Sequence, residues 1–168
     1  MAFVSIVKAS AFTSLRKPVF FITVAVFATL IFLSRHLTIF TLGQPTSMVT
    51  EVGVSSIFLC GILGAIFLNA ASLAAEIETG TLAVLLTKPL TRASVLLAKF
   101  VGNLITLYGA LLLLTIDFFI TLTLEASPVN ALTIQAVILS FLACALASAL
   151  TLVPVSYTHL RAHETSLH

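Results

Sequence analysis

Four long runs of apolar residues constrain this chain more than any other feature of its sequence. We place these runs at about residues 19–40, 52–75, 100–124 and 131–153. Each is close to the roughly 20 residues that a helix needs to cross the ~30 Å hydrocarbon core of a bilayer. Because backbone groups in lipid need internal partners, only helices or closed barrels span membranes. Barrel strands alternate apolar and polar residues and these runs do not, so the sequence predicts an all-α, multi-pass transmembrane fold.

The composition excludes the soluble classes of protein. Hydrophobic residues make up 60% of the chain and charged residues only 8%, whereas a soluble domain carries about 25% charged residues. The remaining polar side chains are too few to cover a water-facing surface, so membrane lipids are the expected surroundings. The net charge of +2 is too small to indicate a nucleic-acid partner. Cys60 and Cys144 lie inside apolar runs and are interpreted as small hydrophobic residues.

Basic residues indicate how the spans are oriented. Arg35 alone lies on one side of the predicted membrane. The basic residues on the other side are Lys8, Arg16, Lys17, Lys88, Arg92 and Lys99. Because loops rich in Lys and Arg stay in the cytoplasm, the sequence predicts a cytoplasmic N-terminus and a cytoplasmic loop at 76–99, in a protein of the cell membrane.

Residues 1–17 predict a helix that lies in the membrane interface. The residues that define its apolar face are Phe3, Ile6, Val7, Ala11, Ser14 and Leu15. Val4 and Phe12 fall outside that face. An elbow is expected at Lys17-Pro18, because the residue before a proline avoids the helical region.

The cytoplasmic loop has a clear internal order. Glu76 and Glu78 place negative charge where the second span ends, and Gly80 permits a tight backbone turn. Residues 81–87 then predict a short apolar helix that ends before Pro89. A further helix begins at about Thr91, which can cap it, and carries Arg92 and Lys99 into the third span.

The short helix needs a place to bury its apolar side chains Leu82, Leu85 and Leu86. The headgroup layer of the membrane is one such place. A groove on a soluble partner is the other, as in the docking of amphipathic helices. The residues themselves leave both interpretations open.

The loop string E-x-E-x-G-T-L-x-x-L-L-x-x-P-L-T-R, followed seven residues later by Lys99, resembles the loop between spans two and three of ABC-2-type transporter permeases. Ala98 stands where that family often has glycine. The family has six spans, so the resemblance implies that four of six are present here, with an interfacial N-terminal helix and a short cytoplasmic coupling helix.

The resemblance also implies partners. In the family the loop contacts a separate nucleotide-binding ATPase subunit, which binds ATP and Mg, while the permease binds no cofactor. Two permease copies, in a homodimer or a related heterodimer, form the transport path. The residues assigned to ATPase coupling by the resemblance are Glu76, Glu78, Gly80, Thr81, Leu82, Leu85, Leu86, Pro89, Arg92 and Lys99. The chain has no Walker motif G-x-x-x-x-G-K-[ST], so ATP hydrolysis is expected in the partner.

The sequence changes character after Pro154. His159 and His163 are four residues apart, a spacing that on a helix can place two imidazoles on one metal ion. The peptide string resembles instead a translated transposon adapter from a sequencing library. We therefore expect residues 1–154 to be part of an ABC-2-type transmembrane domain, truncated at its C-terminal end, and residues 155–168 to be a non-native tail without a metal site.

Three polar residues lie inside the predicted spans. Asp117 is deep in the third span, where an acid is costly and marks either a functional site or a structural carboxyl bonded to a neighbouring helix. Asn69 and Asn103 are expected to hydrogen-bond between helices. No nucleophile–base pair or carboxylate pair is present, so the chain is not expected to be an enzyme.

The interpretation that follows is a permease subunit of an ATP-binding-cassette transporter, with the substrate left open. The alternative is a membrane scaffold or assembly protein that docks a soluble partner through the 76–99 loop.

Overall fold

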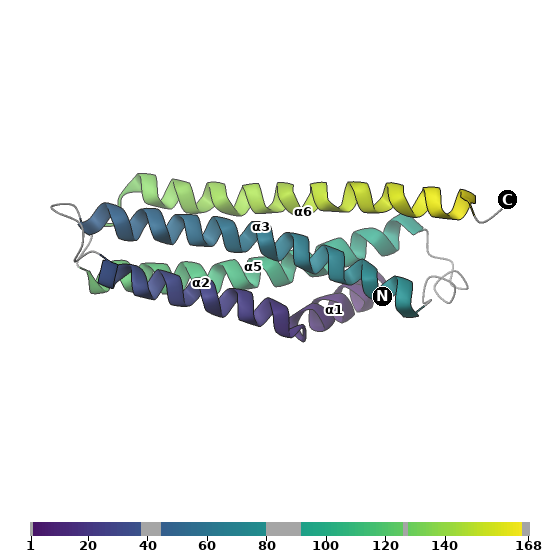
Figure 1. Cartoon of the computed structure of the whole chain (residues 1–168), viewed down its shortest axis with the longest axis horizontal. Helices are drawn as coiled ribbons and strands as arrows, with labels where there is room; N and C mark the ends of the chain where they lie inside the picture. The colour runs from purple at the N-terminus through teal and green to yellow at the C-terminus, as the bar shows by residue number, and fades with distance from the viewer. Residues whose placement is uncertain (1, 38–44, 80–91, 126–127, 166–168) are drawn as a thin grey trace.

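The chain folds into an elongated bundle of helices. The computed structural model describes residues 2–37, 45–79, 92–125 and 128–165, with side chains for 4–36, 48–70, 97–125 and 128–151. The helices are α1 (Ala2–Leu15), α2 (Pro18–Leu37), α3 (Pro45–Thr79), α5 (Arg92–Leu124) and α6 (Ala131–Thr165). In Figure 1 the four long helices run side by side, and α1 lies at the end where α3 finishes and α5 begins. The all-α prediction is confirmed, since the described residues contain no strand.

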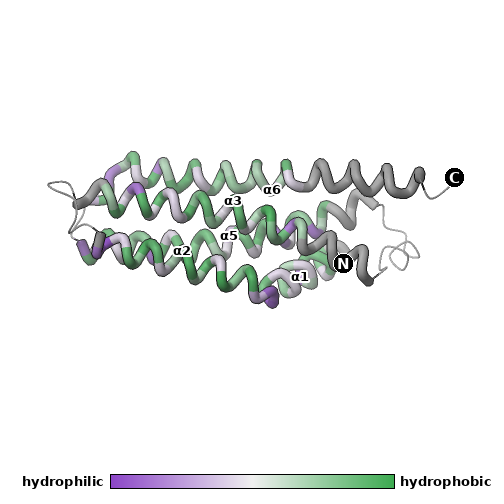
Figure 2. The backbone as a smooth tube through the Cα atoms, viewed as in Figure 1, coloured by the Kyte–Doolittle hydropathy of each residue, from purple (hydrophilic) through white to green (hydrophobic). Residues whose placement is uncertain are grey.

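Each of the four long helices contains a segment that is long and apolar enough to cross a membrane. These candidate spans are Pro18–His36, Met48–Ala70, Leu97–Leu124 and Ala131–Thr151. They agree with the four apolar runs of the sequence to within a few residues at each end. Figure 2 shows hydrophobic residues along the length of the bundle, with hydrophilic residues gathered toward its ends. The prediction of a multi-pass transmembrane protein is therefore confirmed at the level of fold.

The helix boundaries follow from local sequence. Lys17 separates α1 from α2, and Pro18 occupies the first helical position, where its missing N–H costs nothing. The backbone N–H of Lys17 donates to the carbonyl of Ser14 over 3.3 Å, which closes the last turn of α1. At the start of α6, the carbonyl of Asn130 accepts the N–H of Thr133 over 3.0 Å. The expected elbow at Lys17-Pro18 is therefore present.

Helices α3 and α5 form the centre of the bundle. Helix α3 packs against α2, α5 and α6, and α5 packs against α1 and α2 as well. Small residues on α3 allow this close approach, because a Cβ added at Gly61 would collide with the Sγ of Cys144 on α6, and one at Gly64 would lie 2.8 Å from Leu107. Both cysteines are buried free thiols, as expected for residues that act as small hydrophobic groups.

Helix α1 packs against α5 through a face that carries the small polar residues Ser10 and Ser14. The sequence did not predict this contact. A Cβ added at Gly102 of α5 would lie 2.7 Å from Ser10 and 2.8 Å from the carbonyl of Val7. Small side chains bring the two backbones together here. Val7, Ala11 and Ser14 of the expected apolar face meet α5. Leu15 of the same predicted face is 43% exposed. Val4 and Phe12, which fall outside that face, are 56% and 57% exposed.

Candidate functional site

The predicted coupling segment is the loop at residues 76–99. It comprises the end of α3, the start of α5 and the residues between them. Glu76 and Glu78 lie in the last turn of α3, and Arg92 is the first residue of α5. Both helix ends lie at the end of the bundle where α1 is found (Figure 1). The remaining residues of the predicted loop helix lie outside the described residues, and these are Gly80, Thr81, Leu82, Leu85, Leu86 and Pro89. Their assignment to ATPase coupling stays a prediction.

Lys99 is the coupling residue whose surroundings are described. It lies two turns into α5 and is partly buried. The hydroxyl of Ser10 on α1 donates to the Lys99 carbonyl over 3.4 Å. The helix that leaves the predicted loop is thus in direct contact with α1.

A chain of buried and partly buried polar side chains crosses the bundle one turn further along α5. We define the amide cluster as Ser14, Asn69, Asn103, Ser148 and Thr151. Asn103 is 3% exposed, and its Oδ1 accepts from the Ser14 hydroxyl over 2.8 Å. Its Nδ2 donates to the Oδ1 of Asn69 over 3.1 Å. Asn103 therefore joins α1 and α3 through the two ends of one amide.

Asn69 continues the amide cluster to α6. Its Nδ2 donates to Thr151 Oγ1 over 2.6 Å, to the Ser148 carbonyl over 3.1 Å and to Ser148 Oγ over 3.2 Å. Asn69 is 1% exposed. The amide cluster thus links α1, α5, α3 and α6 by uncharged hydrogen bonds, which inside a membrane also satisfy groups that lipid cannot.

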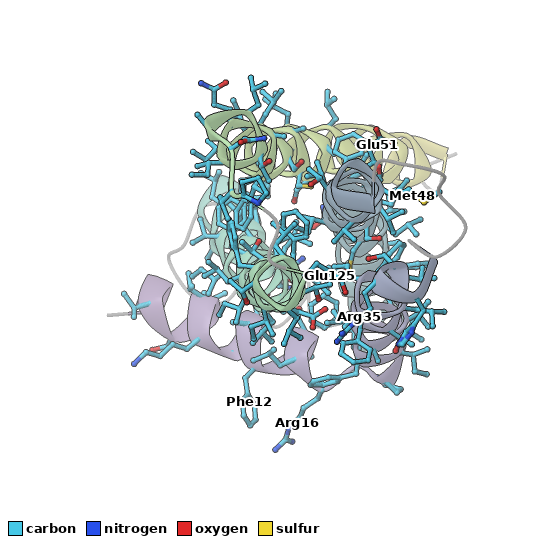
Figure 3. The ribbon with its side chains drawn as sticks, turned by 90° about the vertical axis from the view of Figure 1, so that its left-hand side faces the viewer. Phe12, Arg16, Arg35, Met48, Glu51 and Glu125 are labelled. Atoms are coloured by element: carbon cyan, nitrogen blue, oxygen red, sulfur yellow. The ribbon has the colours of Figure 1, made fainter. Side chains whose placement is uncertain are left out.

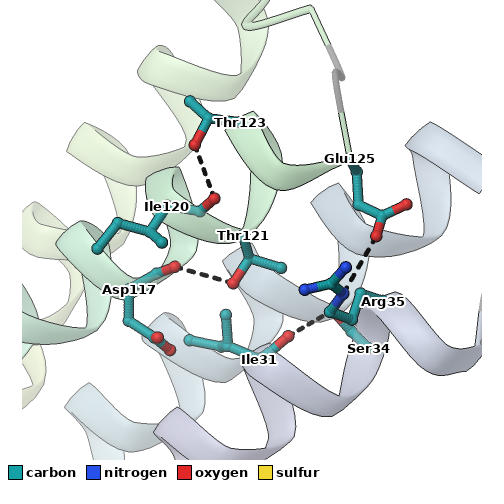
Figure 4. Close-up of polar contacts among 8 residues, drawn as sticks. All are labelled: Ile31, Ser34, Arg35, Asp117, Ile120, Thr121, Thr123 and Glu125. Atoms are coloured by element: carbon teal, nitrogen blue, oxygen red, sulfur yellow. Dashed lines mark hydrogen bonds and ion pairs between the residues drawn. The ribbon is translucent and has the colours of Figure 1, made fainter.

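Asp117 lies apart from the amide cluster. It is fourteen residues beyond Asn103 on α5, which corresponds to about 21 Å along the helix axis. Its Oδ2 is buried and has no hydrogen-bond partner among the described residues. The Thr121 hydroxyl donates to the backbone carbonyl of Asp117 over 2.9 Å, so this bond does not reach the carboxyl group (Figure 4). The structure does not combine the three intramembrane polar residues into one site.

An ion pair lies on the far side of Asp117, at the end of the bundle opposite α1. The Nε of Arg35 on α2 lies 3.3 Å from Oε1 of Glu125, just beyond α5, and both side chains are partly exposed. Figure 4 shows this contact beyond the turns that carry Asp117 and Thr121. The ion pair fixes the end of α2 to the end of α5.

The sequence did not predict the hydrogen-bond partners of Asn69 and Asn103 or the ion-pair partner of Arg35. Ser14, Ser148 and Thr151 complete the amide cluster, and Glu125 pairs with Arg35. The available signal was a Ser or Thr inside an apolar run, which often marks a contact between helices. That signal names the type of residue but not its partner.

Comparison with known proteins identifies the family. A family model described as "ABC-2 family transporter protein" matches residues 3–161. No curated protein and no solved structure matches the chain. The match covers nearly the whole chain, including all four candidate spans and the segment that joins α3 to α5. It agrees with the loop string 76–99 and with the helical bundle, and the chain belongs to the ABC-2 family of transporter proteins.

Proposed function

We propose that this chain is the permease subunit of an ATP-binding-cassette transporter and that a separate ATPase subunit drives it. The observation that carries the proposal is the family match over 3–161, which makes the chain a membrane component of a transporter. The absence of a Walker motif from the sequence is consistent with ATP hydrolysis in a partner. A second permease copy, identical or related, would complete the transport path.

The coupling segment is the proposed docking element for the ATPase. It joins α3 to α5, the two helices that form the centre of the bundle. Displacement of the segment would therefore act on both central helices at once. The amide cluster begins about three turns from the end of α3 and about three turns into α5. Movement of either helix would reach α1 and α6 through hydrogen bonds of Asn69 and Asn103.

The proposal includes an orientation in the cytoplasmic membrane. The coupling segment must face the cytoplasm, because ATP and its hydrolysing subunit are there. The basic residues near the segment and in residues 1–17 support the same orientation. Single cysteines introduced at Leu90 and Thr46, in a background without Cys60 and Cys144, test it by labelling from outside the cell. Labelling is expected at position 46. Labelling at position 90 would contradict the proposed orientation.

The decisive test is loss of the ATPase when the apolar face of the segment becomes charged. Leu85→Asp places a carboxylate where the proposal requires an apolar contact, so co-purified ATPase should fall roughly tenfold or more. Val84→Asp is the matched control, because on the predicted helix 81–87 it lies on the side opposite Leu82, Leu85 and Leu86.

The outcomes separate the permease from the scaffold interpretation. Membrane insertion should be normal in both variants, because residues 84 and 85 lie between the candidate spans Met48–Ala70 and Leu97–Leu124. Equal ATPase recovery from the wild-type chain and Leu85→Asp would contradict the docking role and favour a helix in the headgroup layer. Loss of ATP-driven transport together with loss of the ATPase only in Leu85→Asp would support the proposal.

A further inference from the structure

Helix α1 presents two faces of different chemistry. Its inner face packs small residues against α5. Its outer side carries one line of exposed residues spaced four apart, which we define as the outer stripe: Val4, Lys8, Phe12 and Arg16. Figure 3, viewed along the bundle, shows Phe12 and Arg16 projecting from α1 away from the other helices. The outer stripe therefore lies on the outer surface of the bundle.

The outer stripe alternates apolar and cationic side chains. The guanidinium carbon of Arg16 lies 4.2 Å from the centroid of the Phe12 ring. Stacking of this kind orders the guanidinium and leaves the N–H groups at its edge available to an anion. The outer stripe thus pairs an apolar surface with ordered cationic donors.

Among the described side chains, no carboxylate forms an ion pair with Lys8 or Arg16 of the outer stripe. The first 50 residues contain no Asp or Glu. Among the described side chains, Glu125 pairs with Arg35 at the opposite end of the bundle. The elbow adds a further cation, Lys17, and burial lowers the pKa of its ammonium group. A ligand that complements this surface carries negative charge.

The neighbouring helix indicates where in the membrane the outer stripe lies. The first turns of α2 expose Val19 and Ile22, with 53% and 62% of their surface accessible. These residues belong to a candidate span, so they need acyl chains around them. Because α1 precedes that span directly, Lys8 and Arg16 lie at the depth of the headgroups. The ligand at this depth is a lipid.

We propose that the outer stripe of α1 binds an anionic phospholipid, with its phosphate on Lys8 and Arg16 and its acyl chain along Phe12 and Val4. Charge complementarity distinguishes this lipid from a zwitterionic one, in which an ammonium group offsets the phosphate. Each cation near an anionic surface contributes about a fivefold preference, and two contribute about 25-fold. Salt weakens the preference, because the outer stripe is exposed.

The test compares two lipids on the purified full-length chain. Fluorescent phosphatidylglycerol and phosphatidylcholine are titrated onto the protein in uncharged detergent, and the ratio of their dissociation constants is measured. Arg16→Gln and Lys8→Gln should each reduce the preference for phosphatidylglycerol about fivefold, and the double variant about 25-fold. Phe12→Leu keeps the apolar surface and removes the stacking, so it should lower the preference less than Arg16→Gln.

Arg35→Gln is the matched control. Arg35 also lies over a phenylalanine ring, 5.8 Å from the centroid of Phe32, but it pairs with Glu125 within the protein. Its substitution should leave the lipid preference unchanged. The inference is overturned if all three single cation variants lose the preference equally, or if Lys8→Gln and Arg16→Gln keep it. Loss of co-purified ATPase from those two variants with an unchanged lipid preference would also overturn it, and would make the outer stripe a protein contact.

Discussion

The two ends of the helical bundle are held together by different chemistry. At the end where α1 lies, the amide cluster joins four helices through buried, uncharged hydrogen bonds. At the opposite end, one partly exposed ion pair joins α2 to the end of α5, and Asp117 leaves a buried oxygen without a described partner. The end that is hydrogen-bonded is also the end from which the proposed coupling segment leaves.

This difference between the two ends of the bundle affects how a conformational change is transmitted across the membrane. Buried amides are directional and cannot be replaced by water inside lipid, so they keep helices in register. A partly exposed ion pair contributes little energy and exchanges with water. We therefore expect the α1 end to move as one unit with the coupling segment, while the opposite end rearranges more readily.

The largest effect is expected from Asn103→Leu. The substitution removes the partner of both Ser14 and Asn69 and leaves their buried polar groups unsatisfied. The free energy of unfolding should fall by about 3 kcal/mol, measured by denaturant unfolding in mixed micelles. Thr115→Val is the control, since the Thr115 hydroxyl bonds only the Leu111 carbonyl of its own helix. Equal losses in the two variants would remove the distinction between the amide cluster and ordinary helix bonds.

A smaller loss is expected from Gly102→Ala. The new methyl group would meet the backbone of α1 at Val7 and the Cβ of Ser10, and one of the two helices must shift. The cost should be about 2 kcal/mol. Gly109→Ala on the same helix is the matched control, because a Cβ there meets nothing within 4 Å. It should raise stability by about 1 kcal/mol through helix propensity. Destabilisation by both variants would argue against close packing of α1 as the cause.

Asp117→Leu tests the opposite end. Replacing a buried oxygen that has no partner by an apolar group should raise the free energy of unfolding by about 1 kcal/mol. Transport measured in the same variant separates the two interpretations of this residue. A stabilised chain that no longer transports identifies Asp117 as functional. A destabilised chain contradicts the assignment of an unpartnered carboxyl.

The smallest effect is expected from the ion pair. Glu125→Gln should cost about 0.5 kcal/mol, because both partners are partly exposed and solvent weakens their attraction. A double-mutant cycle with Arg35→Gln isolates the pairwise contribution from other contacts of Arg35. A coupling energy as large as the loss in Asn103→Leu would show that the two ends of the bundle are equally fixed.

The spans could be predicted from the sequence because each depends on local composition alone. A run such as 131–153 is apolar throughout, and its helical state in lipid follows without knowledge of neighbours. The extensions of α3 to Thr79 and of α6 to Thr165 did not follow, since residues there are no longer apolar. The prediction that residues 155–168 are a non-native tail stays a prediction, and the family match reaches residue 161.

The polar contacts could be predicted only in part. Asn69 and Asn103 were expected to bond between helices, yet the sequence could not show that they bond each other. That contact depends on the relative rotation and height of α3 and α5, which packing decides. The sequence grouped Val7 and Ser14 on one face of α1 and placed that face in the membrane interface, and for a similar reason it could not show that they pack against α5. The assignment of Asp117 and of the coupling residues remains to be tested by the variants above.

The position of Asn69 has a consequence for biogenesis. Spans enter the membrane in chain order, so α3 is in lipid before α6 is synthesised. Until α6 supplies Ser148 and Thr151, the amide donors of Asn69 have no acceptor from that helix. The nascent protein therefore carries an unsatisfied polar group that favours association with α6. Asn69→Leu should therefore cost less stability in a chain that ends after residue 125, where only the bond from Asn103 is lost, than in a chain that includes α6.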